Sequence, residues 1–524
     1  MLLKTNFKKK RKGYAMALFL LVMVVITVAV SGLALASRSS LESSRTALYR
    51  NEARLLALST VDTFYAKLTE STSSQDLFIS ALRNPSQRNS FFPGWISDQN
   101  SPGASLGSNG AWQNCTMGST APTDRVCAKL TVTVAQGTVD VPLLILLTAD
   151  VDAGCFGKKE KCIKASFQQR LRKPEFYDYL QLNTNAIINP ADPTLNGQYL
   201  GDACETQNFN NYSSRCKDLI PAYRSSDKFT GPVYAGDAGL LICPGPTVTT
   251  PSKVLPDFTT VEVASVNATW TSAADYRADT GCLAKSAVST PLPITSVTSL
   301  TFPSQSDISK VITNAGSSKY TVTAKTGQVN LVIDATGIRI NPSEIVESLT
   351  VVPNNSVLEV LNASNTTVSG TAYGSLTIVN DGDIEINGDI RLNDQNTSAV
   401  ALVSRNGSIV IDQVATDTEA RTINAVLVSI SKSVYVKNWN AKDYVSTASR
   451  EPELLITGTI AGKFQGVFGS YDSVSGSLSG GYRKSFNWDL RFRDPLLAGQ
   501  LFPWLPRPTT IDWRRLDLTE VKAV

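Results

Sequence analysis

Residues 9–36 read KKRKGYAMALFLLVMVVITVAVSGLALA, and this stretch decides where the rest of the chain is placed. Residues 14–36 carry no charge, whereas the twelve residues before Gly13 carry five lysines, one arginine and no acid. About twenty apolar residues suffice to span a bilayer as a helix, and the basic flank of such a helix stays in the cytoplasm. We therefore expect a membrane helix, with the following residues on the outer side.

Three interpretations of this segment are open. The first is a secretory signal peptide, for which Ala34-Leu35-Ala36 offers a cleavage site before Ser37. Its apolar run is longer than the roughly 7–15 residues of an ordinary signal peptide. The second is a plain N-terminal anchor, and the third depends on the residues around Gly13.

A short basic leader that ends in Gly13, followed by Tyr14 and an uninterrupted apolar helix, resembles the N-terminus of type IV prepilins. This resemblance implies that a membrane peptidase cuts after Gly13 and that the new N-terminus at Tyr14 is methylated. The fifth residue after the cut is Leu18, where major pilins have glutamate. In this respect the chain resembles the PilX-like minor pilins and the tip pseudopilins, which implies a role other than that of a bulk filament subunit.

The pattern after the apolar run predicts that the helix continues. The first proline is Pro85, and apolar residues recur at steps of three, four and seven, as on one helix face. These residues are Leu41, Leu48, Leu55, Leu58, Val61, Tyr65 and Leu68. A helix from Tyr14 to about Thr69 would be roughly 80 Å long. A pilin stalk gives a reason for this length, whereas a signal peptide does not.

Composition and charge exclude several classes of function. The net charge of the 524 residues is +4, and removing the six cations of the leader leaves −2, so nucleic acid could be held only by local basic patches. Histidine is absent, which excludes Ser-His-Asp and Cys-His catalysis and zinc sites that contain histidine. Walker-type phosphate loops are also absent. We predict no catalytic residue, no metal site and no cofactor.

All eight cysteines lie between residues 115 and 282, and their even number indicates disulfides formed outside the cytoplasm. Short loops favour the pairs Cys115–Cys127, Cys155–Cys162, Cys204–Cys216 and Cys243–Cys282. Other pairings remain possible from the sequence, because eight cysteines allow about 105 of them.

Residues 71–125 are rich in Ser, Asn, Gly and Pro and predict a long loop. Alternating apolar residues then predict paired strands over 129–134 and 139–151, joined near Gln136-Gly137, and a third strand over 162–171. A helix followed by a small antiparallel sheet is what a pilin head requires.

Two segments combine cations with aromatic residues, a combination suited to phosphate contact and base stacking. The first is GCFGKKEKCIK at residues 154–164, and the second is the C-terminal section 481–524. The candidate DNA-binding residues are Phe156, Lys158, Lys159, Lys161, Lys164, Arg491, Arg493 and Trp504. The structural alternatives are a solvated hairpin tip for the first segment and a packed cap for the second.

An internal repeat with a period of 25 residues covers 376–386, 401–411 and 426–436. In this alignment Ile378, Val403 and Val428 are equivalent, as are Ile384, Ile409 and Val434, and Ile386, Ile411 and Val436. Repeated short strands at this spacing predict the coils of a β-solenoid, and a flat β-sandwich is the alternative. Solenoids also occur in glycan-cleaving enzymes, and Asp381, Asp383, Asp389 and Asp412 are the carboxylates that could form a catalytic pair. The first three stand beside Gly or Asn, and we expect all four in turns rather than in a catalytic pair.

The predicted fold class is α+β, with a long N-terminal helix, a small antiparallel head and a large β-solenoid. The predicted segments are a leader (1–13), a membrane and stalk helix (14–70), a head with a long loop (71–175), an irregular disulfide-stapled region (176–319), the solenoid (320–480) and a cap (481–524). This architecture resembles the ComZ-type competence pilins with a solenoid domain.

The resemblance implies a minor pilin, located at or near a pilus tip, that supports DNA uptake, adhesion or twitching motility. Its expected partners are other pilins, the assembly machinery of the inner membrane and the prepilin peptidase, with DNA and surface glycans as candidate ligands. The expected location is the inner membrane before assembly and the pilus or cell surface afterwards. The alternative is an anchored or secreted solenoid enzyme or adhesin that acts on surface polysaccharide.

Overall fold

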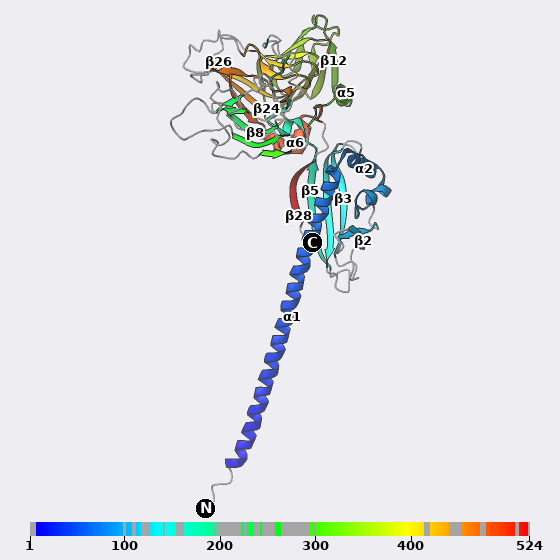
Figure 1. The fold of residues 1–524 in the computed structure, drawn as a ribbon, viewed down its shortest axis with the longest axis vertical. Coiled ribbons are helices and arrows are strands. Elements are labelled where there is room, and N and C mark those ends of the chain that lie inside the picture. The colour runs from blue at the N-terminus through cyan, green and yellow to red at the C-terminus, as the bar shows by residue number, and fades with distance from the viewer. Residues whose placement is uncertain are drawn as a thin grey trace, which may run out of the picture. The chain divides into compact units, whose positions relative to one another are not determined.

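The structure is a computed structural model, and it contains two compact units. It describes residues 7–97, 101–106, 112–116, 126–137, 139, 142–153, 162–185, 187–191, 195, 222–224, 228–234, 241–243, 257–263, 294–296, 300–412, 420–439, 452–471, 478–508 and 513–521. The first unit comprises residues 1–173 and 513–524, and the second comprises 174–512. The fold is α+β, with one long N-terminal helix and large β-sheet regions (Figure 1).

The first unit consists of the helix α1 (Phe7–Thr69) packed on a sheet of six described strands in the order β2-β1-β3-β4-β5-β28. The strands are β1 (Gly103–Leu106), β2 (Trp112–Cys115), β3 (Val126–Gly137), β4 (Pro142–Ala153), β5 (Ile163–Arg172) and β28 (Arg514–Val521). The predicted strands β3, β4 and β5 are confirmed, and they pair antiparallel as expected for consecutive strands.

The loop predicted over 71–125 is wrong in part, because this segment begins with the helix α2 (Thr72–Arg83). The Ser71 hydroxyl accepts a hydrogen bond from the Ser74 amide and so caps the first turn of this helix. The 3₁₀ helix η1 (Pro85–Gln87), the short helix α3 (Arg88–Phe91) and the strands β1 and β2 follow. Phe78 and Phe91 then complete an aromatic cluster around Phe64 of α1.

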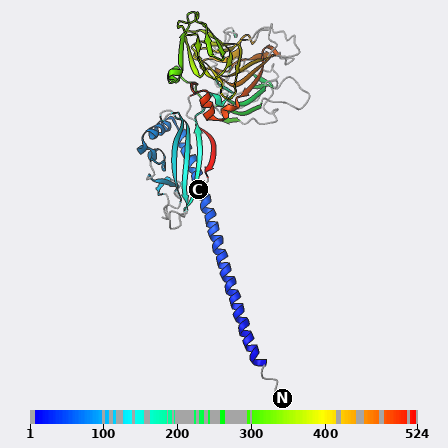
Figure 2. The same ribbon diagram turned by 180° about the vertical axis from the view of Figure 1, so that it is seen from behind.

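The last strand, β28, returns to the first unit and pairs antiparallel with β5. In Figure 2 it lies along the edge of the sheet next to β5. Trp513, just before β28, is fully buried, and its carbonyl oxygen accepts a 2.7 Å hydrogen bond from the Tyr65 hydroxyl of α1. The segment 481–524, predicted as one cap, is therefore divided between the two units.

The second unit is built mainly of parallel strands. Those over residues 319–488 are β12 (Lys319–Thr323), β13 (Gln328–Asp334), β14 (Gly337–Ile340), β15 (Val351–Val352), β16 (Ser356–Leu361), β17 (Asn365–Ala372), β18 (Ser375–Asn380), β19 (Asp383–Leu392), β20 (Ala399–Ser404), β21 (Ile409–Ile411), β22 (Arg421–Ser429), β23 (Val434–Val436), β24 (Glu453–Phe464), β25 (Gly469–Tyr471), β26 (Leu478–Gly481) and β27 (Arg483–Trp488).

Within the described residues most of these strands form three parallel ladders, whereas β14, β15, β25 and β26 pair antiparallel. Ladder 1 runs through β12, β16, β18, β20 and the second halves of β22 and β24. Ladder 2 runs through β13, β17, β19, β21 and β23. Ladder 3 runs through the first halves of β22 and β24 to β27 and then to β8 (Lys228–Tyr234).

The region 176–319, predicted to be irregular, also supplies strands to these ladders. The strand β6 (Gln181–Asn185) pairs in parallel with β24, and β8 pairs in parallel with both β27 and β10 (Asp257–Val263). The other described elements of this region are β7 (Ala222–Arg224), β9 (Leu241–Cys243), β11 (Ile294–Ser296), α5 (Gln305–Thr313), and the 3₁₀ helices η4 (Phe176–Asp178) and η11 (Gly316–Ser318). Strands this short and this distant in sequence from their partners leave no periodic signal, which explains the error.

Most of the predicted repeat register is confirmed. Ile384, Ile409 and Val434 are in register, and so are Ile386, Ile411 and Val436. The alignment of Ile378 with Val403 is wrong by one residue, because Ile378 pairs with Leu402 and Val379 pairs with Val403. The turn before Ile384 has three residues after Asn380, whereas the equivalent turn before Ile409 has four after Ser404. The repeat is therefore 24 residues in ladder 1 and 25 in ladder 2 at this point.

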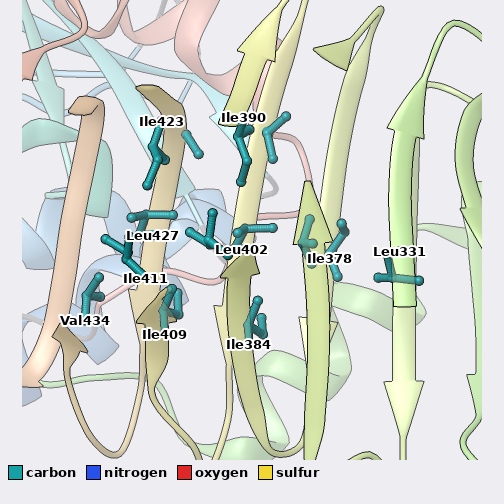
Figure 3. Packing of buried hydrophobic residues seen from close by; sticks show 14 of the residues in the cluster. Leu331, Ile378, Ile384, Ile390, Leu402, Ile409, Ile411, Ile423, Leu427 and Val434 are labelled. Carbon is teal, nitrogen blue, oxygen red and sulfur yellow. The ribbon is translucent and has the colours of Figure 1, made fainter. Parts of the chain in front are cut away.

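The three ladders surround a core of Ile, Leu and Val side chains. Figure 3 shows Ile378 and Leu402 of ladder 1 pointing toward the same interior as Ile384 and Ile409 of ladder 2. The outer side of ladder 1 is also apolar and is covered by the helix α5, by η4, by the 3₁₀ helix η12 (Leu490–Arg493) and by α6 (Pro495–Leu501). The outer sides of ladders 2 and 3 carry mostly polar residues.

Of the predicted disulfides, Cys115–Cys127 is confirmed, with Cα atoms 5.9 Å apart, and it ties β2 to β3. Cys162 is also disulfide-bonded. The other predicted pairings involve Cys155, Cys204, Cys216, Cys243 and Cys282, whose side chains lie outside the described part of the structure.

Candidate assembly helix and candidate ligand surfaces

The first half of α1 presents an apolar surface that no described element of the chain covers. Every residue from Met16 to Tyr49, except Tyr49 itself, is exposed, and no part of the most apolar window is buried. By length and composition, this is the one helix among the described residues that could cross a membrane. An exposed apolar surface of this size near the N-terminus is compatible with a membrane anchor and with a signal sequence.

The second half of α1 packs on the sheet through a face that matches the predicted one in part, since Val61 and Leu68 are buried and Leu58 and Tyr65 pack against the same core. Its buried residues are Ala53, Leu56, Ala57, Thr60, Val61, Phe64 and Leu68. Leu41, Leu48 and Leu55 were predicted on the same face but are 58%, 55% and 66% exposed. An α-helix turns about 100° per residue, so Leu55 lies about 180° from Phe64. The three leucines therefore form an exposed stripe on the side of α1 that faces away from its sheet.

The candidate processing residues Gly13 and Tyr14 lie within α1, and their side chains are outside the described residues. The cut predicted after Gly13 remains a prediction.

The candidate DNA-binding residues are only partly described. Phe156, Lys158, Lys159 and Lys161 lie outside the described residues. Lys164 is exposed near the start of β5, where its register partner on β4 is Asp152. It belongs to the first unit, whereas the three candidates from the C-terminal section belong to the second.

The three C-terminal candidates differ in burial and in the contacts that their side chains make within the chain. The guanidinium of Arg491 donates to both carboxylate oxygens of Asp489 and to the carbonyl oxygen of Ser398 at 2.8 Å. Trp504 is partly buried against the apolar cover of ladder 1. Arg493 is exposed. Of the three, Arg493 is best placed to meet a ligand.

Each of the four aspartates considered for catalysis contacts another residue of the protein. Asp381 forms a 2.7 Å ion pair with Arg405, and Asp383 accepts a 2.7 Å hydrogen bond from the Ser408 amide. Asp389 pairs with Arg391 at 2.7 Å, and Asp412 lies 3.9 Å from Lys437. Asp389 lies inside β19 rather than in the predicted turn. Within the described residues, no group of three or more Cys, Asp or Glu side chains could hold a metal ion.

One cluster of charged side chains could not be predicted from the sequence. Glu359 of β16 lies against Arg405, and its other oxygen is 2.8 Å from Lys319. Burial acts to raise the pKa of Glu359, but hydrogen bonds from Lys319 and Arg405 outweigh it and hold that pKa below its ordinary value. Lys319 lies 40 positions before Glu359 and Arg405 lies 46 positions after it, so only the stacking of the strands brings the three together.

The comparisons with known proteins identify no relative: no family model, no curated protein and no solved structure matches this chain.

Proposed function

We propose that this chain is a minor pilin of a type IV pilus. The observation that carries the proposal is the uncovered apolar half of α1, which continues into a helix packed on an antiparallel sheet. In this proposal the apolar half lies in the inner membrane before assembly and among the helices of other pilins afterwards. The stripe of Leu41, Leu48 and Leu55 extends the apolar contact surface beyond the membrane segment.

For the second unit, the finer proposal is a β-solenoid over the strands β12 to β27. Its support is the order of the strands, since each ladder visits successive coils in the same parallel sense. Ser404 and Ser429, buried at equivalent corners, donate 2.8 Å hydrogen bonds to the carbonyl oxygens of Gly382 and Gly407 in the preceding coil. Such repeated corner contacts are what stacked coils need to satisfy their backbone.

The test of pilin processing is the N-terminus of the full chain extracted from membranes, measured by intact mass and by N-terminal peptide sequencing. A start at N-methylated Tyr14 is the expected result, and Gly13→Ala should abolish it. A start at Ser37 would overturn the proposal, because it would identify the apolar segment as a signal peptide. The chain would then be a secreted protein of another class, such as an adhesin or an enzyme acting on polysaccharide.

The specific role proposed for this pilin is support of DNA uptake, with the basic segment 154–164 as the contact. This segment carries four lysines against one glutamate. Reversing the charges of Lys158, Lys159 and Lys161 should weaken binding of duplex DNA and flatten its dependence on salt, because fewer counterions are released. Reversal of Lys310 and Lys325, two lysines of the second unit, is the control. Unchanged affinity in the variant of the basic segment would remove that segment from this role.

A further inference from the structure

Four uncharged polar residues lie in register across ladder 3. Asn424 pairs with Thr457, Thr457 with Asn487, and Asn487 with Thr230. All four are exposed or partly exposed. Neighbouring strands are about 4.8 Å apart, so this polar row extends over about 14 Å across the ladder.

Two glycines directly follow residues of the polar row in the sequence. Gly458 follows Thr457 with φ +147°, and Gly231 follows Thr230 with φ +154°. A Cβ atom on Gly458 would lie 2.1 Å from the carbonyl oxygen of Ala425, and one on Gly231 would lie 2.5 Å from the Cβ atom of Trp488. Both positions thus require glycine, and both are where a strand passes from ladder 3 to ladder 1. The row is held on rigid strands next to this bend.

The side chains of the polar row have no hydrogen-bond partner within the described protein. Ladder 2 differs in this respect. There Thr367 donates to Asn330, Asn365 donates to Glu385 at 2.9 Å, and Glu385 pairs with Lys437 at 2.6 Å. Asn330, Asn365 and Thr367 of ladder 2 are therefore used in mutual contacts, whereas the two amides and two hydroxyls of the polar row are available to a ligand.

We propose that the polar row binds a neutral polysaccharide chain. Amides and hydroxyls can both donate and accept hydrogen bonds, as sugar hydroxyls can, so each partner can satisfy the other. The row itself carries no cation, so it offers a phosphate polymer no electrostatic gain. Two cations lie close to it in register, and both are paired: Lys228 with Glu453 at 3.2 Å, and Arg391, which follows the register partner of Ile423, with Asp389 at 2.7 Å. The adjacent register row contains Leu455, which is partly exposed and can contact the apolar face of a sugar ring.

The test uses the full chain in detergent and three probes: dextran, cellohexaose and chitohexaose. The variant Thr230→Val/Thr457→Val removes two hydroxyls but keeps β-branched side chains, so thermal unfolding should be unchanged. We expect it to bind a probe at least about tenfold more weakly than the wild type, since each lost hydrogen bond weakens binding several-fold. The control Gln328→Ala/Ser369→Ala alters polar residues of ladder 2 and should bind as the wild type does.

Three results would overturn the inference. They are no binding of any probe by the wild type, equal binding by the polar-row variant, and duplex DNA binding that is lost in that variant. The inference does not rest on pilin processing, because a chain that starts at Ser37 would expose the same row. The N-terminal measurement and the glycan measurement therefore test two proposals, and either proposal can be wrong while the other holds.

Discussion

At the residue scale, the cluster of Glu359, Arg405 and Lys319 shows how a parallel stack tolerates buried charge. The side chains of Glu359 and Arg405 are 9% and 7% exposed, so neither is hydrated by bulk water. Each is compensated by two opposite charges, because Glu359 contacts Lys319 and Arg405, and Arg405 contacts Glu359 and Asp381. Burial of such groups is tolerated only when partners of this kind are present.

Removing Arg405 alone should therefore cost more than removing a surface ion pair. The variant Arg405→Met keeps the packing of the side chain but leaves Glu359 with a single cation. We expect the free energy of unfolding of the second unit to fall by about 3 kcal/mol, measured by urea denaturation. The matched control is Arg391→Met, whose exposed pair with Asp389 should contribute less than about 1 kcal/mol. Equal effects of the two changes would contradict this account.

The same cluster gives a pH dependence with a definite sign. The pKa of Glu359 in the folded chain lies below the ordinary value of 4.5, so its contribution to stability is complete above pH 4.5. That contribution is lost as the pH falls from 4.5 through the lower pKa of the folded state. The melting temperature of Glu359→Gln should therefore fall less than that of the wild type over this acidic range, and parallel pH profiles would be evidence against it.

At the element scale, the sequence predicts strands better than it predicts which side chains share a face. The steps of seven that join Leu41, Leu48 and Leu55 did indicate a helix, but the core side of that helix contains the small residues Ala53 and Ala57. Small residues allow a helix to approach a sheet closely, but they are not conspicuous when large apolar residues are used to find the buried face. The stripe of leucines is therefore a real pattern that belongs to the uncovered face.

Register shows the same limit. The period of 25 residues locates the strands of the repeat, yet the turn after Asn380 is one residue shorter than the turn after Ser404. Since a shift of one residue moves a side chain to the opposite side of a sheet, Ile378 faces the interior while its neighbour Val379 faces the cover of ladder 1. Turn lengths are set locally and are not visible in an average period.

Candidate sites made of distant residues were the least predictable. Thr230 and Asn487 are neighbours in the polar row but are separated by more than 250 residues in the sequence. Neither residue stands in a motif, because Thr and Asn are common on any exposed strand. Only the pairing of β8 with β27 places them together, and no periodicity in the sequence predicts this pairing. The basic residues before Gly13, by contrast, are contiguous with the apolar helix, so the prepilin resemblance can be proposed from the sequence alone, and it stays a prediction.

At the scale of the whole molecule, the second unit is an insertion between two adjacent strands of the first. The chain leaves the sheet after β5 and returns at β28, and Arg172 and Arg514 are register partners at that point. The return is anchored on α1, where Arg515 contacts Asp62 and lies 4.1 Å above the ring of Tyr65. Arg54 of the same helix pairs with Glu520 at 2.9 Å. These contacts join residues 1–173 to residues 513–524, the two segments that make up the first unit.

The first unit should consequently fold without the insertion. Replacing residues 174–512 by Asn-Gly joins Lys173 to Trp513 through a turn that suits two antiparallel strands. We expect a shortened chain that unfolds cooperatively on heating, retains the Cys115–Cys127 disulfide and shows a buried Trp513 by fluorescence. Trp513→Ala in the same background should lower the free energy of unfolding by about 3–5 kcal/mol, because it removes a fully buried ring. A shortened chain without a cooperative transition would mean that the sheet depends on the insertion. Cooperative unfolding would instead show that α1 and its sheet form a unit that folds without residues 174–512.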